Sequence, residues 1–156
     1  KLLASSRKAG SSYTCMVAPY MIDSAHPLCG VNGVFNGIFL HGNALGDAMF
    51  YGSGAGKLPT ASAVVADVVD MARHQHTNIY IDWKPEKLTL VSYDDSVNRF
   101  FVRTDSPKEE VEKIFGNVSY VENVVDGEYG FTTEAMAEKD FAAKADKINV
   151  INRIRL

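Results

Sequence analysis

The sequence predicts an α+β chain in which a strand, turn, strand, glycine turn and helix precede a ferredoxin-like βαββαβ unit. Two observations support this class. Residues 51–67 join a glycine-dense turn to a helix whose apolar side chains recur at three- and four-residue spacing. Residues 96–156 contain a strand pattern, a charged helix, a hairpin, a second helix and a closing strand, which is the order of a split βαβ unit.

In the first half, the basic residues 1–9 are helix-compatible and a turn cluster at 10–12 ends them. Pro19 has no N–H to donate to a sheet, so we expect residues 13–22 to form an edge strand. Residues 31–40 suit a strand that is covered on much of both faces. The expected elements are the helix-compatible segment at 1–9, strands at 13–22, 31–40 and 48–51, and a helix at 61–73.

In the second half, Asp126-Gly127 separates two strand-like runs and is typical of a hairpin turn. The expected elements are strands at 98–104, 118–125, 129–133 and 149–156, and helices at 107–115 and 135–148. We therefore expect three parts: residues 1–77, a connector at 78–95, and the ferredoxin-like domain at 96–156.

Composition and charge favour a soluble, cytoplasmic protein. Of the 156 residues 46% are hydrophobic, and 16 basic against 19 acidic side chains give a formal net charge of −3. This balance gives no argument for a nucleic-acid or membrane partner, and no apolar run approaches the roughly 18 residues of a membrane span. Cys15 and Cys29 are expected to be buried free thiols. His74 and His76 lack nearby carboxylates or thiols, so we expect no metal site.

The glycine turn at residues 52–56 is the strongest candidate binding feature. Glycines let a backbone approach a ligand closely, and a helix start presents unpaired N–H groups to it. The spacing fits neither a phosphate-binding P-loop, because Leu58 follows Gly56-Lys57, nor the G-x-G-x-x-G dinucleotide fingerprint. Pattern alone leaves two readings open: a ligand-binding turn, or a tight turn with a purely structural role.

Four segments of the first half occur in a characteristic order: His26-Pro27-Leu28, Val31 to Asn36, Gly46 to Gly56, and Pro59 to Val64. Together they closely resemble the C-terminal part of homoserine dehydrogenase. Cys29 and Gly37 depart from that pattern, in which alanine is expected.

The resemblance implies an enzyme that interconverts aspartate β-semialdehyde and homoserine with NADH or NADPH, on the route to threonine, methionine and isoleucine. In that family the dinucleotide fingerprint, the proton-donating lysine, its acidic partners and the monovalent-cation ligands lie upstream of the position of Lys1. We therefore assign no catalytic residue, and we expect the chain by itself to be inactive. The family also pairs its central domains, so we expect a homodimer through the strand at 31–40.

The resemblance also assigns one cofactor contact to this chain. The last glycine of the segment, Gly56, is expected to contact the nicotinamide nucleotide. Gly54 and Thr60 are further cofactor-binding candidates, although turn geometry and helix capping also explain them.

The last third resembles an ACT domain, an amino-acid-sensing module. Its ligand loop has the pattern Asp-x-Pro-Gly, whereas this chain has Asp105-Ser106-Pro107-Lys108. Lysine replaces the glycine that allows close approach. Two readings therefore stay open for this end of the chain: amino-acid binding, or packing and dimerisation. A regulatory module without catalytic activity is the alternative to the enzyme reading.

Overall fold

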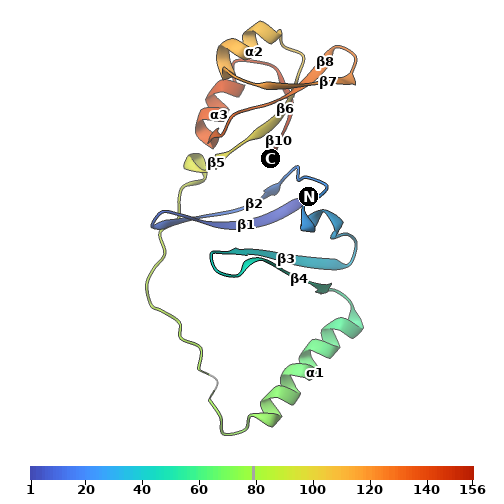
Figure 1. Cartoon of the computed structure of the whole chain (residues 1–156), viewed down its shortest axis with the longest axis vertical. Helices are drawn as coiled ribbons and strands as arrows, with labels where there is room; N and C mark the ends of the chain where they lie inside the picture. Colours follow the sequence, from blue (N-terminus) through green and yellow to red (C-terminus); the bar gives the residue numbers. More distant parts are fainter. Residues whose placement is uncertain (79) are drawn as a thin grey trace. The chain divides into compact units, whose positions relative to one another are not determined.

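The structure is a computed structural model that describes residues 1–78 and 80–156, with the side chains of residues 122–124 left out. It contains helices and strands throughout, which confirms the α+β class (Figure 1). The chain forms two compact units. One holds Lys1–Ile22 together with Glu86–Leu156, and the other holds Asp23–Pro85. The division at residues 77 and 95 expected from the sequence stays a prediction.

The chain begins with a β-hairpin, so the helix-compatible reading of residues 1–9 was wrong. Strand β1 (Leu2–Ala9) pairs antiparallel with β2 (Ser12–Pro19) along its whole length. Gly10 turns the chain with φ 62°, a conformation that glycine adopts at little cost. Cross-strand pairing over eight residue pairs outweighs the modest helix preference of this segment.

In the second half of the chain, the strands and helices follow each other in the predicted order, βαββαβ. Its four-stranded sheet has the strand order β10-β6-β8-β7, with every neighbouring pair antiparallel. The elements are β6 (Phe100–Thr104), α2 (Lys108–Phe115), β7 (Ser119–Val125), β8 (Glu128–Thr132), α3 (Glu138–Ala145) and β10 (Val150–Arg155).

Short elements join this sheet to the rest of its unit. A 3-10 turn, η2 (Tyr93–Asp95), leads into β5 (Val97–Asn98), which pairs with β9 (Met136–Ala137). The pairing of β9 shortens the helix expected at 135–148, because its first residues are drawn into a strand. Backbone hydrogen bonds also join Tyr13 of β2 to Thr89 and Val91.

Both helices cover the same side of the four-stranded sheet, and six apolar residues form the core between them (Figure 1). The Phe100 and Phe141 rings stack with their centroids 4.0 Å apart, and both side chains are fully buried. The complete set is Phe100, Val102, Val111, Phe115, Phe131 and Phe141. These positions follow the two-residue and helical spacings that predicted the unit.

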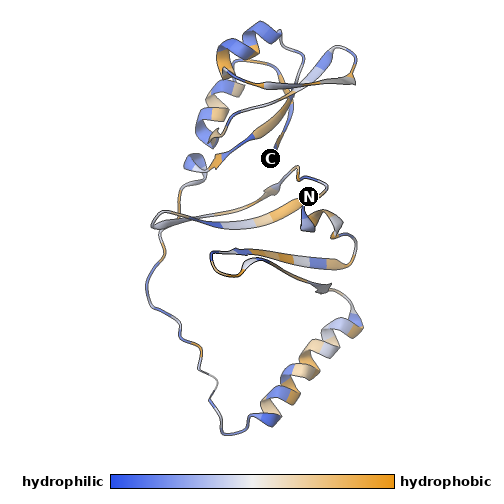
Figure 2. Ribbon diagram, in the orientation of Figure 1, coloured by the Kyte–Doolittle hydropathy of each residue, from blue (hydrophilic) through white to orange (hydrophobic). Residues whose placement is uncertain are grey.

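The other unit contains a short 3-10 helix η1 (Pro27–Gly30), strands β3 (Phe35–Gly42) and β4 (Gly46–Ser53), and helix α1 (Lys57–Arg73). The expectation that the strand at 31–40 is covered on both faces was wrong for the described chain. Ile38, Leu40 and Phe50 form an open apolar face. Helix α1 has no buried residue, and the ribbon colours of Figure 2 show hydrophobic and hydrophilic residues alternating along it.

The two thiols also differ from expectation. Cys29 is partly buried, but Cys15 is exposed on β2, so the prediction of two buried thiols was wrong for Cys15. Its Sγ lies 3.5 Å from the hydroxyl of Ser6, the residue opposite it on β1. The cause is that no described residue covers this face of the hairpin at Cys15.

We predict that Phe141→Ala lowers the unfolding free energy by about 3–5 kcal/mol, because it removes a buried ring from the core and leaves a cavity. Urea unfolding followed by circular dichroism measures the change. Val97→Ala is the control, since Val97 is 61% exposed and surface substitutions typically change stability by about 0.5 kcal/mol or less. Equal effects of the two substitutions would contradict the assignment of this core.

Candidate functional site

The candidate site is the glycine turn between β4 and α1. Gly56 has φ 120° and ψ 154°, a backbone region that only glycine occupies readily. The backbone conformation of this turn therefore favours glycine at residue 56. A side chain at residue 56 would be strained whatever space surrounds it.

Gly56 is also the residue that begins the helix. Its carbonyl oxygen accepts the first intrahelical bond from the N–H of Thr60, at 3.1 Å. No side chain caps this end, and the first turn of α1 contains no acidic residue. The N–H groups of Lys57 and Leu58 therefore belong to the positive end of the helix and suit a ligand that carries an acceptor or a negative charge.

The three residues proposed from the sequence have different surroundings. Gly56 and Thr60 are brought together by the first helical hydrogen bond. At Gly54, a Cβ atom would collide with the side-chain amide of Asn36, so this glycine allows Asn36 to lie against the turn. Sequence reasoning missed Asn36. The signal for it is the pairing of Asn36 with Gly52 across the β3–β4 hairpin.

The second candidate is the loop between β6 and α2, at Asp105 to Lys108. The Thr104 hydroxyl accepts from the N–H of Ser106 at 3.0 Å and donates to the carbonyl of Asn149 at 2.6 Å. The N–H of Asn149 donates to the Ser106 hydroxyl, and its side-chain amide donates to Asp105, both at 2.9 Å. Pro107 has no N–H. The chain itself thus uses donors and acceptors of this loop, and Asn149 was not predicted.

Two tyrosines lie beside the same loop. The Lys108 ammonium lies 4.8 Å from the ring centroid of Tyr120 and 5.6 Å from that of Tyr129. The Tyr129 hydroxyl donates to the carbonyl of Ser106 at 2.7 Å. Burial, together with the hydrogen bond that Tyr120 donates to Glu112, raises the pKa of Tyr120 to about 12. Burial also raises the pKa of Tyr129. Residue 108, at which the ACT loop pattern would have a glycine, is a lysine that contacts two aromatic rings.

Among the described residues, no three histidine, cysteine or acidic side chains gather closely enough to hold a metal ion. Over the same part of the chain, no helix is both long and apolar enough to cross a membrane.

Comparison with known proteins gives a consistent result. Residues 1–69 match the sequence family described as homoserine dehydrogenase. The homoserine dehydrogenase of Neisseria gonorrhoeae is 33% identical over 117 residues, which cover 70% of this chain and 27% of that protein. The chain spans about a quarter of the length of the curated relatives it matches.

Solved structures agree over the whole chain. The crystal structure of a homoserine dehydrogenase from Thiobacillus denitrificans matches with a TM-score of 0.79 at 27% identity, covering 100% of this chain and 42% of that chain. The S. aureus homoserine dehydrogenase matches with a TM-score of 0.70 at 25% identity, covering 99% of this chain and 41% of that one. Both matched structures, like the curated relative, are named as homoserine dehydrogenases. The chain belongs to the homoserine dehydrogenase family, which confirms the resemblance found in its sequence.

We predict that Gly56→Ala costs about 1–3 kcal/mol of local strain and loosens the first turn of α1. Hydrogen exchange at the Thr60 amide, which bonds to the Gly56 carbonyl, should become faster. Gly52→Ala is the control, because residue 52 has open space for a Cβ and no positive φ. Unchanged exchange at Thr60 in Gly56→Ala would show that the turn tolerates a side chain.

Proposed function

We propose that this chain is the C-terminal portion of an NAD(P)-dependent homoserine dehydrogenase and that Gly56 contacts the nicotinamide nucleotide in the complete enzyme. The observation that carries the proposal is the uncapped start of α1 behind a positive-φ glycine. This turn lies inside the segment that matches the family, residues 1–69. Gly54 and Thr60 are proposed as flanking contacts on the same turn.

The complete enzyme would reduce aspartate β-semialdehyde to homoserine, reversibly. When bound, the nucleotide would supply the hydride that the aldehyde carbon receives, and a proton would be added to the carbonyl oxygen. In our proposal this chain contributes positioning: backbone N–H groups at the start of α1 hold an acceptor atom of the nucleotide, and Gly56 leaves room for it. We propose that the proton donor, the dinucleotide fingerprint and the monovalent-cation site lie outside these residues. A cytoplasmic location follows from the same proposal.

The division of the chain into 1–77, 78–95 and 96–156 is proposed on the same basis. The first part carries the family match, and the last part is the ferredoxin-like domain. The compact units follow a different boundary, because the β1–β2 hairpin belongs to the unit that contains the C-terminal sheet. Family origin and compact packing therefore divide this chain at different residues.

We expect the purified chain to show no turnover of NADH or NADPH with aspartate β-semialdehyde or homoserine. Without a proton donor and the main nucleotide site, one backbone contact supplies neither acid catalysis nor orientation. Nucleotide absorbance over time is the measurement, with an intact homoserine dehydrogenase as the positive control. Sustained turnover by this chain would overturn the assignment of the catalytic groups to other residues.

We propose that the complete protein is a homodimer and that β3 contributes to its interface. Ile38, Leu40 and Phe50 form an apolar face that is 48–64% exposed, and a two-stranded hairpin needs such a face covered to be stable. A second copy would cover it symmetrically.

Light scattering should give the mass of a dimer for the chain, and Ile38→Lys should reduce it to the mass of a monomer, because it places a charge in the apolar face. Ile81→Lys is the control, since Ile81 is similarly exposed, at 67%, but lies outside β3. A monomeric mass for the unsubstituted chain at high concentration would count against this interface.

A second candidate function is an ACT-type regulatory or dimerisation module. The ferredoxin-like strand order favours it. The loop at Asp105 to Lys108 argues against amino-acid binding there, because several of its hydrogen-bonding groups already bond to other residues of the chain. The observations therefore favour packing or dimerisation over sensing as the role of this module.

We expect L-threonine to leave the melting temperature unchanged. A ligand at about 100 times its Kd would add about 2.7 kcal/mol of stability, which a melting curve detects. Lys108→Gly is the matched variant, because it restores the missing glycine and removes the cation from the two tyrosine rings. A saturable threonine-dependent shift in the unsubstituted chain would show that sensing survives.

A further inference from the structure

One carboxylate at the start of α3 accepts hydrogen bonds from three other elements of its unit. Glu138 is only 3% exposed. Its Oε1 accepts from Arg155 Nε at 2.6 Å and from Asn98 Nδ2 at 2.9 Å. Its Oε2 accepts from Arg155 Nη2 at 3.0 Å and from the Tyr93 hydroxyl at 3.1 Å. The carboxylate therefore holds η2, β5 and β10 to α3.

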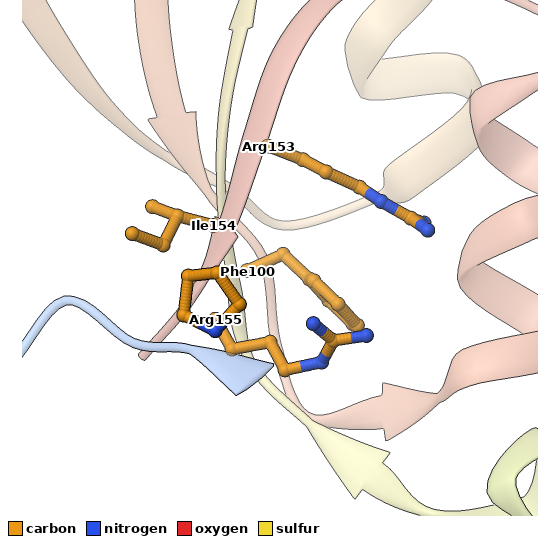
Figure 3. Close-up of a pocket in the computed structure, with 5 residues that line it drawn as sticks. Phe100, Arg153, Ile154 and Arg155 are labelled. Carbon is orange, nitrogen blue, oxygen red and sulfur yellow. The ribbon is translucent and has the colours of Figure 1, made fainter. Parts of the chain in front are cut away.

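Arg155 binds the Glu138 carboxylate through two of its guanidinium nitrogens, Nε and Nη2. Its Nη2 also donates to the Tyr93 hydroxyl at 2.7 Å, and its guanidinium lies 6.0 Å from the ring centroid of Phe100. Figure 3 shows the side chains of Arg155 and Phe100 lying beside each other. The hydrogen bond to Glu138 raises the pKa of Arg155 above its usual value. Removing one partner of a buried pair leaves the other charge without compensation, which is strongly unfavourable.

The backbone of the same arginine holds the end of the N-terminal hairpin. The carbonyl oxygen of Arg155 accepts from the N–H of Met21 at 2.7 Å, and Tyr20 forms a parallel bridge with Arg155. Tyr20 is 6% exposed, so the hairpin end is buried at this point. One residue thus binds α3 through its side chain and the hairpin through its main chain.

Packing around this contact is open, in contrast to the core of the sheet. A cavity of about 410 Å³ lies beside it, lined by Pro19, Met21, Phe101, Arg103, Asn152, Arg153 and Ile154. A smaller one of about 50 Å³ is lined by Pro19, Phe100 and the last residues of β10 (Figure 3). A third, of about 40 Å³, lies between the hairpin and residues 96–98. The hairpin end is therefore bordered by open space on several sides, and the backbone bonds to Arg155 are directional contacts that fix its position on β10.

We propose that the Glu138–Arg155 pair is a joint that controls whether the end of the β1–β2 hairpin is docked on β10. When the pair is formed, Arg155 is fixed in the extended geometry that presents its carbonyl to Met21. When the pair is broken, β10 loses its side-chain anchor and the hairpin end is released, while the aromatic core keeps the sheet folded. Glu138 acts on the hairpin through Arg155, so it is a positioning residue.

The test is Glu138→Gln in the full chain, followed by amide hydrogen exchange. Glutamine keeps the shape but removes the charge that Arg155 requires. We expect the Met21 amide to exchange about tenfold faster or more, since its hydrogen bond to Arg155 opens locally. The amide of Val102, at the centre of the sheet, should keep its rate. Glu112→Gln is the matched control, because Glu112 accepts a hydrogen bond from the Tyr120 hydroxyl at 3.0 Å and lies on α2, away from the residues that line these cavities.

A milder variant keeps the proposal testable if Glu138→Gln does not fold. Tyr93→Phe removes one donor to Glu138 without leaving a buried charge unpaired, and should speed exchange at Met21 by a smaller factor with Val102 unchanged. The proposal is overturned if Met21 exchange is unchanged in these variants, or if Met21 and Val102 accelerate together, since global loss of stability then explains the effect. Acceleration at Met21 in Glu112→Gln would also overturn it.

Discussion

The stack of Phe100 on Phe141 is the contact on which the C-terminal unit depends. Phe100 lies on β6 opposite Arg155 of β10, and Phe141 lies about one helical turn after Glu138. With the rings 4.0 Å apart, the strand and the helix are fixed at a separation that lets the guanidinium meet the carboxylate with two hydrogen bonds. A buried ion pair is tolerated only with such geometry. The packing of the two rings therefore determines where the Glu138–Arg155 ion pair can form.

The unit at Asp23–Pro85 is built on the opposite principle. Its helix α1 buries no residue, and its two strands carry an open apolar face. An isolated two-stranded hairpin is at best marginally stable. The described residues therefore give this unit local geometry, including the positive φ of Gly56, without a core of its own. The apolar side chains whose spacing predicted α1 are exposed in the described structure.

Local patterns in the sequence predicted most of the fold. The sheet strands, the turn at Asp126-Gly127 and the start of α1 all have short-range signals. The segment at 1–9 was misread because its residues suit a helix, and only pairing with residues 12–19 decides its conformation. The cover of the 31–40 strand was misread for a related reason: burial depends on partners that lie far away or outside the described chain.

The candidate site was only partly visible in the sequence. The resemblance pointed to Gly56, and the structure places this glycine directly before α1 with a positive φ, while its contact with a nucleotide stays a prediction. Asn36, which lies against Gly54, depends on the register of the β3–β4 hairpin. Glu138 was not identified, since it is one of several charged residues in its helix. Its partners lie 17 to 45 residues away in the sequence.

The hairpin end has a further consequence for the family-matched segment. Residues 1–69 match the family, yet residues 1–22 pack with the C-terminal sheet. The chain therefore leaves this unit after Ile22 and returns to it at Glu86, so the segment that carries the glycine turn is tethered to one unit at both ends. Backbone hydrogen bonds hold the chain to this unit near both points: Met21 bonds to Arg155, and Tyr13 bonds to Thr89 and Val91.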